Sequence, residues 1–391
     1  MSKDGTLTLE VARFVQDADW HSVPEPVRDR CKAAMVDGLA VMLAGSRTEC
    51  AQVLARYLEG LGIQGPATLV GRQGTAPASF AALFNGTCGH ALDYDDTQVP
   101  SRPDRVYGLL THPGVPVLAA SLAVAQEAGA SGGELLTAFC TGVEVSCKLA
   151  EAIKPQHYIR GFHSTGTLGV FGVAAAAARL LALDLEQTRH AIGIAASKSA
   201  GIRVAFGTMT KPYHAGAAAE NGIVAARLAS LGYRTDPNAL DGQWGFFQVA
   251  GGGCDPGLLL GRLGNPYAIV EPGVSIKPYP CGSLAHPTMD ALLELLVEYD
   301  VRPQEVEEIG VGTSSNVLAA LRYNEPQNGL EARFSIPFMM AILVLERRAG
   351  IREFTDETVQ RLEVREMMRR VRPYLHPELE AQGFERIRSL V

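Results

Sequence analysis

The feature that most constrains this fold is a set of long segments in which alanine and glycine occupy several faces of a helix. Examples are GTLGVFGVAAAAARLLAL at 166–183 and AGAAAENGIVAARLA at 215–229. Helices covered by small residues pack closely against several neighbours, as in the interior of a large bundle. Because the first segment contains Arg179 and several glycines, we interpret it as a buried helix and not as a membrane span. We therefore expect a large helical core.

The chain changes character at about residue 268. Before it, helical patterns occur at 23–45, 48–62, 78–93, 113–128, 132–152, 165–183, 185–200 and 215–231, with one strand-like run at 67–71. After it, YAIVEPGVSIKPYP and VEEIGVGTSS carry β-branched residues between turn formers and predict strands. Helical patterns follow or separate them at 284–299, 330–347 and 355–371. We expect a mainly α protein, with an all-helical domain at 1–267 and a smaller α+β domain at 268–391.

Charge and cysteine content exclude several classes of protein. The net charge is −7, which argues against a general binder of nucleic acid or anionic membranes. The N-terminus shows no signal-peptide pattern, and the seven cysteines include no C-x-x-C pair. We expect a cytoplasmic protein with reduced thiols and no zinc or iron–sulfur framework.

The segment NGTCGHALDYDDTQ at 85–98 concentrates three carboxylates, Asp93, Asp95 and Asp96, within four residues. Their mutual repulsion needs cations or hydrogen-bond donors to offset it. The cluster is either a metal or substrate site, or a solvated helix end. A magnesium-binding DD-x-x-D motif would need an acid where Val99 stands, so the isoprenoid-synthase reading is weak.

Two histidine motifs precede apolar or glycine-rich helices. His112 lies in a His-Pro-Gly turn, and His163 is followed by Ser164 and Thr165 at the start of the helix at 165–183. Free backbone N–H groups at such a start can receive a carboxylate or phosphate. The glycines do not form G-x-G-x-x-G, so a dinucleotide site is not expected.

A Lys-Pro-Tyr sequence occurs twice, with Lys211 followed by His214 and with Lys277 followed by Tyr279 and Cys281. Only seven of the 35 basic residues are lysines, so the repeated use of lysine stands out. A lysine shifts its pKa readily, whereas arginine stays charged. We expect both lysines in extended boundary segments, because a proline disfavours the helical conformation of the residue before it.

The chain carries no H-E-x-x-H, P-loop or G-x-S-x-G motif. Any chemistry must therefore come from histidine, lysine, carboxylate or tyrosine side chains.

The ordered set GHALDYDDT, HPGVPVLAA, GFHSTGTLG, TKPYHAGAAAENG, KPYPCGSLAHPTMDA and EARFSIPF strongly resembles the MmgE/PrpD family, from about residue 5 to the end. This family includes 2-methylcitrate dehydratases, cis-aconitate decarboxylases and iminodisuccinate epimerases. The resemblance implies a homodimer that uses no cofactor and no metal, with its active site between a helical and an α+β domain. It implies a small polycarboxylate as the substrate.

The resemblance also identifies site residues. It implies that the acid–base and charge-stabilising groups are Asp93, His112, His163, Lys211 and Lys277. Substrate binding is expected of Thr97, Ser164, Thr165, His214, Tyr279 and Cys281. The two lysines would then converge on one polycarboxylate and stabilise the enediolate-like species that develops beside it.

Three departures from the family pattern bear on the function. The gap between Thr97 and His112 is long, and Gln98 stands where a histidine is common. Phe338 replaces a common tyrosine, whose hydroxyl Tyr213 or Tyr279 would have to supply. The chain also ends at FERIRSLV, where family members usually continue, so we expect a shortened C-terminal segment.

The leading expectation is a lyase of the 2-methylcitrate dehydratase type. An epimerase or isomerase of the iminodisuccinate type is the alternative, because it needs no acid for a leaving hydroxyl. A cis-aconitate-type decarboxylase is third, and a catalytically silent carboxylate-binding or structural member is the alternative of another class.

Overall fold

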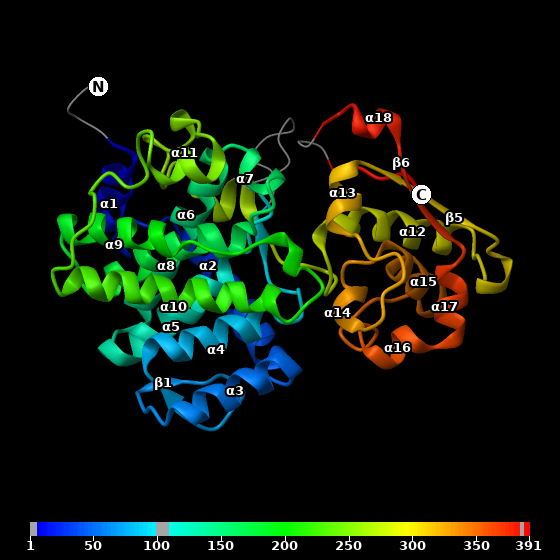
Figure 1. Ribbon diagram of the computed structural model, residues 1–391, viewed down its shortest axis with the longest axis horizontal. Helices are drawn as coiled ribbons and strands as arrows, with labels where there is room; N and C mark the ends of the chain where they lie inside the picture. The colour runs from blue at the N-terminus through cyan, green and yellow to red at the C-terminus, as the bar shows by residue number, and fades with distance from the viewer. Residues whose placement is uncertain (1–5, 99–108, 384–386) are drawn as a thin grey trace.

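The protein consists of a large helical body and a smaller α+β body, which lie side by side (Figure 1). The computed structural model describes residues 6–98, 109–383 and 387–391. The predicted mainly α fold class is confirmed. One hydrophobic core includes residues from Leu7 to Val274, and a second extends from Cys281 to Val391 and also takes in Phe206. The division near residue 268 stays a prediction, because Ala268 and Ile269 pack in the first core.

The large body is built around helices α8 (Ser164–Leu180) and α10 (Thr210–Ser230), which pack against each other. Helix α4 (Ala78–His90) packs against α10, and α6 (Gly132–Ala152) packs against α8. The remaining long helices surround them: α1 (Leu7–Asp17), α2 (Glu25–Gly45), α3 (Glu49–Leu61), α5 (Gly114–Ala128) and α9 (Leu185–Lys198). Shorter elements are α7 (Gln156–Ile159), α11 (Phe246–Gly251), β1 (Ala67–Thr68) and β2 (Thr75–Ala76).

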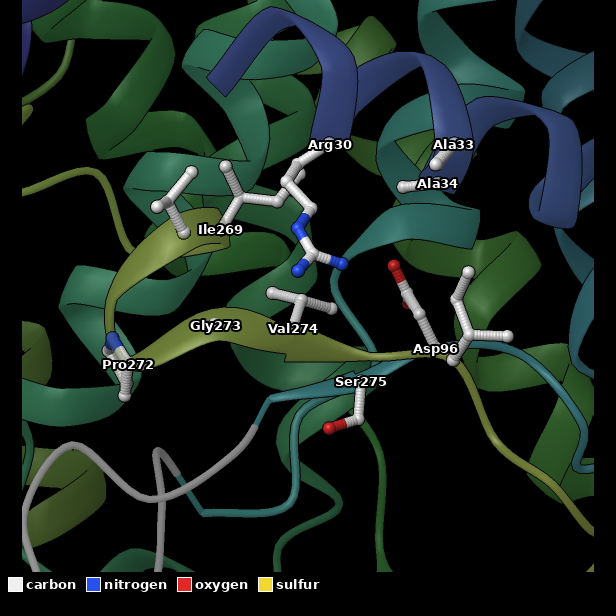
Figure 2. Close-up of a pocket in the computed structure, with 11 residues that line it drawn as sticks. Arg30, Ala33, Ala34, Asp96, Ile269, Pro272, Gly273, Val274 and Ser275 are labelled. Atoms are coloured by element: carbon white, nitrogen blue, oxygen red, sulfur yellow. The ribbon is translucent and has the colours of Figure 1, made fainter. Parts of the chain in front are cut away.

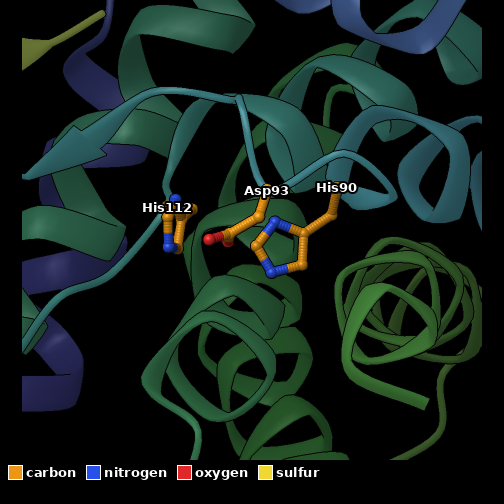
Figure 3. Close-up of side chains that lie close together, drawn as sticks. All are labelled: His90, Asp93 and His112. Atoms are coloured by element: carbon orange, nitrogen blue, oxygen red, sulfur yellow. The ribbon is translucent and has the colours of Figure 1, made fainter. Parts of the chain in front are cut away.

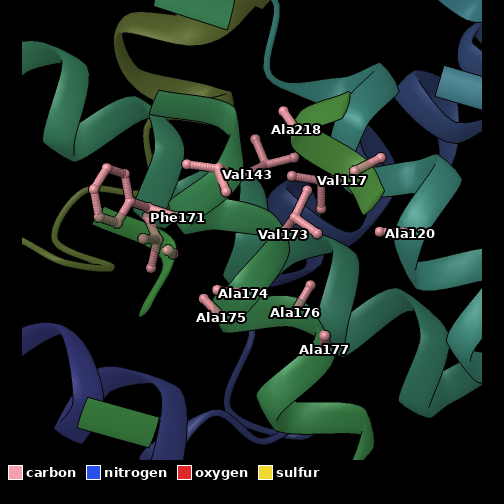
Figure 4. Packing of buried hydrophobic residues seen from close by; sticks show 14 of the residues in the cluster. Val117, Ala120, Val143, Phe171, Val173, Ala174, Ala175, Ala176, Ala177 and Ala218 are labelled. Atoms are coloured by element: carbon pink, nitrogen blue, oxygen red, sulfur yellow. The ribbon is translucent and has the colours of Figure 1, made fainter. Parts of the chain in front are cut away.

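The expected close packing of small residues is confirmed. The residues from Ser164 to Ala178 of α8 are all buried, and Ala174–Ala177 lie among valines of neighbouring helices (Figure 4). Side chains of this size let helix backbones approach one another, which makes the interior sensitive to any added volume. The packing holds α4, α8 and α10 in a fixed relation, and these three helices carry most of the site described below.

The α4–α10 crossing supplies a first prediction. A Cβ atom added at Gly216 would lie 2.2 Å from the carbonyl oxygen of Leu83, which is backbone and cannot rotate away. We expect Gly216→Ala to lower the free energy of unfolding by about 1–3 kcal/mol, the usual cost of overpacking. Gly60→Ala in α3, where nothing lies within 4 Å, is the control and should be neutral or mildly stabilising. Urea denaturation measures both; equal midpoints for the two variants would contradict the prediction.

The small body contains a two-stranded parallel sheet covered by helices. Strand β5 (Ile309–Thr313) pairs with β6 (Val371–Leu375), with Ile309 opposite Val371. The second strand was not predicted, because its residues VRPYL lie after a helical pattern. The helices are α12 (His286–Glu298), α13 (Ser315–Ala320), α14 (Gly329–Ala332), α15 (Ile336–Glu346), α16 (Asp356–Gln360), α17 (Leu362–Met368) and α18 (Pro377–Glu380).

Two local expectations were wrong. The run at 267–280 forms only a short strand, β4 (Val274–Ser275), after a wide helical turn at Ile269–Gly273. Lys211 lies in the first turn of α10 rather than in an extended segment. Pro212 is tolerated there because the first turn of a helix has no internal acceptor for the N–H that proline lacks.

No helix among the described residues is long and apolar enough to cross a membrane. All seven cysteines are free thiols, and six of them are buried, in agreement with the expectation of reduced cysteines.

Candidate active site

The centre of the candidate site is Asp93, three residues beyond the end of α4. Its backbone adopts a left-handed conformation (φ 50°), and its side chain is buried. The Lys211 Nζ donates to Asp93 Oδ1 at 2.6 Å. The Lys277 Nζ lies 3.3 Å from Asp93 Oδ2, an ion pair without hydrogen-bond geometry, and donates to the Asp93 backbone oxygen at 2.5 Å. The two lysines of the repeated motif therefore meet at one carboxylate.

Different elements deliver the two lysines. Lys211 projects from the first turn of α10, and Lys277 follows β4. Strand β4 pairs with β3 (Thr97–Gln98), with Thr97 opposite Ser275, and this pairing brings Lys277 close to the acidic segment. Lys211 is 118 residues from Asp93 in the chain, and Lys277 is 184 residues from it. The tertiary fold alone therefore brings the two lysines to Asp93.

His90 and Asp95 form a hydrogen-bonded pair beside this cluster. The His90 Nδ1 lies 2.8 Å and 2.9 Å from the two carboxylate oxygens of Asp95. The His90 Nε2 lies 2.7 Å from Lys211 Nζ. His90, the last residue of α4, is 1% exposed and Asp95 is 0% exposed, so water does not weaken these contacts.

His112 and Thr165 connect the turn before α5 to the start of α8. The Thr165 hydroxyl accepts from the His112 backbone N–H at 3.1 Å, and His112 Nδ1 donates to the Asp96 backbone oxygen at 2.8 Å. The ring of His112 packs edge-on against that of His90, with centroids 4.8 Å apart. The ring orientation of His112 is therefore fixed by its neighbours.

His163 and His214 share a hydrogen bond between their Nδ1 atoms, 3.0 Å apart, so one donates and the other accepts. The His163 Nε2 is buried and has no partner among the described residues. Its ring also packs against Phe206, with centroids 5.1 Å apart. His163 thus carries a polar atom that a bound molecule could satisfy.

A cavity of about 30 Å³ lies where these groups meet. This volume holds little more than one or two waters, so a substrate enters only after the walls move apart. Both bodies form the walls. The large body contributes Asp93, Leu110, His112, Tyr158, His163, Phe206 and Lys211, and the small body contributes Gly282, Ser283, Leu284, Ala320, Leu321 and Phe334.

Burial governs the proton affinities in this cluster. Burial alone would raise the pKa of Asp93, but Lys211 and Lys277 outweigh it and hold the pKa well below the usual range. Burial lowers the pKa of Lys211, although Asp93 opposes this. Burial also lowers the pKa of His112 to about 3 and the pKa of His163 well below its usual value. Both histidines are therefore neutral at pH 7, and each can serve as a hydrogen-bond partner.

Three side chains of the cluster could form a metal triad by spacing alone. Ligand atoms of His90, Asp93 and His112 lie within 4.8 Å of one another (Figure 3). However, Lys211 Nζ already contacts His90 Nε2 and Asp93 Oδ1, and Lys277 contacts the other Asp93 oxygen. An ammonium group in that position repels a metal cation, so the arrangement is an ion-pair network.

Asp96 faces away from the cluster. One of its oxygens accepts from the Gly114 backbone N–H at 3.0 Å. Asp96 lines a separate cavity of about 340 Å³ together with Arg30 of α2 and the segment around β4 (Figure 2). Burial and the charge of Asp95 raise the pKa of Asp96 well above its usual value. The three clustered aspartates thus have three different environments.

Several predicted residues do not line the cavity between the bodies. The Tyr279 hydroxyl donates to Asp290 at 2.7 Å, and Cys281 is packed in the second core with its thiol 3.6 Å from the Met289 sulfur. Thr97 and Ser164 are buried, and their hydroxyl oxygens have no partner among the described residues.

The departures from the family pattern lie away from the cavity or outside the described residues. Phe338 is fully buried in the second core against Phe354, with ring centroids 5.3 Å apart. Tyr213 is 44% exposed on α10, and neither it nor Tyr279 lines the cavity. Gln98 is buried and donates to Glu151 at 3.1 Å. Most of the long gap, at 99–108, lies outside the described residues.

Sequence reasoning missed His90, Phe206 and Phe334 as parts of this network, whereas it named Asp95 only as one of three clustered carboxylates. The Lys211 Nζ lies 5.3 Å from the centroid of the Phe206 ring and 5.5 Å from that of Phe334, so both rings contribute cation–π contacts. The spacing of His90 three residues before Asp93 was an available signal, since such residues share one side of a helix end.

Comparison with known proteins identifies the family of this chain. The model of the MmgE/PrpD N-terminal domain matches residues 9–258, and that of the MmgE/PrpD C-terminal domain matches residues 279–390. The chain is 29% identical to a cis-aconitate decarboxylase of Homo sapiens, over 94% of this chain and 76% of the relative. It is 29% identical to the cis-aconitate decarboxylase of Mus musculus, over 97% of this chain and 78% of the relative. It is 23% identical to the cis-aconitate decarboxylase of Aspergillus terreus, over 96% of this chain and 80% of the relative. This chain belongs to the MmgE/PrpD family.

Proposed function

We propose that this protein is a cofactor-independent lyase that acts next to a carboxylate of a small polycarboxylic acid. The observation that carries the proposal is the charge balance around the cavity. Lys211, Lys277 and the buried Arg333 supply three cations, against the two carboxylates Asp93 and Asp95. A buried excess of positive charge is costly unless an anion binds. A carboxylate substrate would supply that anion.

The same groups suit chemistry beside a carboxylate. Loss of CO₂ or of a proton there leaves negative charge delocalised over an enediolate-like species. Ammonium groups fixed in a site from which water is excluded stabilise such charge without reorganising. Lys211, whose pKa burial lowers, lines the cavity and is suited to move the proton. Neutral His112 also lines the cavity and is suited to hydrogen-bond the substrate.

Decarboxylation of a cis-aconitate-like unsaturated acid is the first specific candidate. The relatives named above carry that activity in their names, over nearly the whole of this chain. Dehydration of a 2-methylcitrate-like hydroxy acid, the expectation from the sequence, is the second. The buried position of Phe338 supports keeping it, because a tyrosine hydroxyl there would lie in the second core and outside the cavity. The proposal also includes a homodimer, as the resemblance implies, and a cytoplasmic location, as expected from the reduced cysteines.

Proton NMR in D₂O distinguishes these reactions. We expect the purified protein to convert cis-aconitate with release of CO₂ and the appearance of new vinyl signals. A vinyl product from 2-methylcitrate without CO₂ would assign the dehydratase reaction instead. Uptake of deuterium from the solvent into iminodisuccinate, without net product, would indicate an epimerase. No change in any of the three acids, with binding seen by calorimetry, would contradict lyase activity and leave a carboxylate-binding protein.

A further inference from the structure

Behind Lys211 lies a continuous chain of short polar contacts that leads away from the cavity. Lys211 Nζ lies 2.7 Å from His90 Nε2, and His90 Nδ1 lies 2.8 Å from Asp95 Oδ1. Of these three residues, only Lys211 lines the cavity. The side chains of His90 and Asp95 are both 0% exposed. The hydrogen bond from Lys211 to His90 therefore links the pair to the cavity.

The contacts determine where the protons lie. An ionised Asp95 only accepts hydrogen bonds, so His90 Nδ1 carries a proton and donates it. The His90 Nε2 then has two states. It accepts from the Lys211 ammonium while the imidazole is neutral, or it carries a proton and donates to a neutral Lys211 amine. In both states, each nitrogen of His90 has a hydrogen-bond partner, Asp95 on one side and Lys211 on the other.

We propose that Asp95 and His90 are positioning residues that form a proton relay with Lys211. This inference rests on the proposed function for the role of Lys211 in catalysis. In the relay the Lys211 Nζ–H bond breaks as a His90 Nε2–H bond forms, and the Asp95 carboxylate stabilises the resulting imidazolium. Lys211 is then an amine, ready to take a proton from the substrate. The reverse transfer makes it an acid, so no further reactant is consumed.

Each charged state of the relay has a carboxylate partner. Proton transfer replaces the ion pair of the Lys211 ammonium with Asp93 by an ion pair of the His90 imidazolium with Asp95, so no buried charge is left unpaired. Asp93 holds Lys211 from the other side at 2.6 Å, so the amine stays in place in either state. The charged and titratable groups that surround the relay are Asp93, Lys277, His112, His163, His214 and Arg333.

Two variants test the relay by kinetics. We expect Asp95→Asn and His90→Gln to lower kcat by about 10²-fold or more, the usual contribution of acid–base catalysis, while KM changes less than about threefold. Removing the charge of Asp95 also weakens proton binding by the His90–Lys211 pair. The limb of the pH–kcat profile that reports this pair should therefore move to lower pH. A uniform loss of kcat at all pH values would indicate a merely structural role and overturn the relay.

A titration without substrate separates failure of the relay from failure of the proposed function. With only seven lysines, ¹³Cε labelling should resolve Lys211, assigned by its loss in Lys211→Arg. We expect the titration midpoint of Lys211 to fall in Asp95→Asn, but not in Asp241→Asn, a distant carboxylate that binds the backbone of α1. An unmoved midpoint in Asp95→Asn would overturn the relay. A moved midpoint in a protein that turns over none of the acids would support the coupling and reject the lyase assignment alone.

Discussion

Lys211→Met is expected to lower kcat by about 10²- to 10⁴-fold, the range that removal of a general acid or base produces. Lys211 is the one described residue that contacts Asp93 and His90 and also lines the cavity, so its loss removes a charge and a proton carrier together. Lys277→Met removes the second cation beside Asp93 and should also lower kcat by orders of magnitude. Steady-state kinetics on the acid identified by NMR measures both effects.

The matched controls separate catalysis from folding. Lys32→Met removes an exposed lysine of α2 and should leave kcat unchanged. In Lys211→Met the Asp93 carboxylate keeps Lys277 as a partner, so we expect a native circular dichroism spectrum. Lys211→Arg keeps the charge but cannot exchange a proton near neutral pH, and should not restore turnover. Near-normal kcat in Lys211→Met would contradict the proposed role of this residue.

The second large effect is a steep loss of stability in mild acid. Burial lowers the pKa of six of the nine histidines: His90, His112, His157, His163, His214 and His286. The pKa falls to about 3 for His112 and His286, and to about 4 for His157 and His214. A group whose pKa is lower in the folded state contributes stability above its unfolded pKa near 6.5. That stability is lost as pH falls toward the folded value. Each such histidine lowers the free energy of unfolding by about 1.4 kcal/mol per pH unit in that range.

Buried carboxyl groups with a raised pKa oppose this effect, because they bind protons in the folded state first. Burial raises the pKa of Asp37 to about 6 and of Glu144 to about 7, and it also raises the pKa of Asp96 and Glu220. The shifted histidines outnumber these carboxyl groups, so the unfolded chain binds more protons than the folded one in mild acid. The free energy of unfolding should therefore fall as pH drops below 6, by about 1.4 kcal/mol per pH unit for each proton of difference.

Urea denaturation at pH 7.5, 6.5, 5.5 and 4.5 measures this slope. His157→Gln provides the matched control, because His157 is buried outside the cavity, between Thr167 and Ala250. It should reduce the slope by about 1.4 kcal/mol per pH unit. Stability that stays constant between pH 6.5 and 4.5 would contradict the prediction.

Helical periodicity and small-residue content were enough to predict the large body. The helices expected at 113–128, 132–152 and 185–200 agree with α5, α6 and α9 within about two residues at each end. The prediction failed where a local rule competed with a helix start. The rule that a proline keeps the preceding residue extended hid the first turn of α10, and with it the helical setting of Lys211. The two-residue strand β4 depends on pairing with β3, which no local pattern reveals.

The site shows the same division between local and tertiary information. Asp93, His112, His163 and Lys211 were expected together from the family resemblance, and they line one cavity. Their convergence does not follow from local sequence, because the pairs are separated by up to 118 residues. His90 was missed because its contact with Lys211 joins residues that are 121 apart in the chain. Tyr279 and Cys281 share the motif of Lys277, but they lie in the bends at 278–281, where their side chains contact Asp290 and Met289 instead of the cavity.

The contact between Lys277 and Asp93 has a consequence for cooperativity. The two hydrophobic cores are distinct, and such an architecture would by itself allow each body to melt separately. Here, detaching the small body would pull an ammonium group off the Asp93 carboxylate and expose Phe206, which the large body contributes to the second core. Buried charges would then be left without their partners in both bodies at once. We therefore expect these contacts to make the two bodies unfold as one unit.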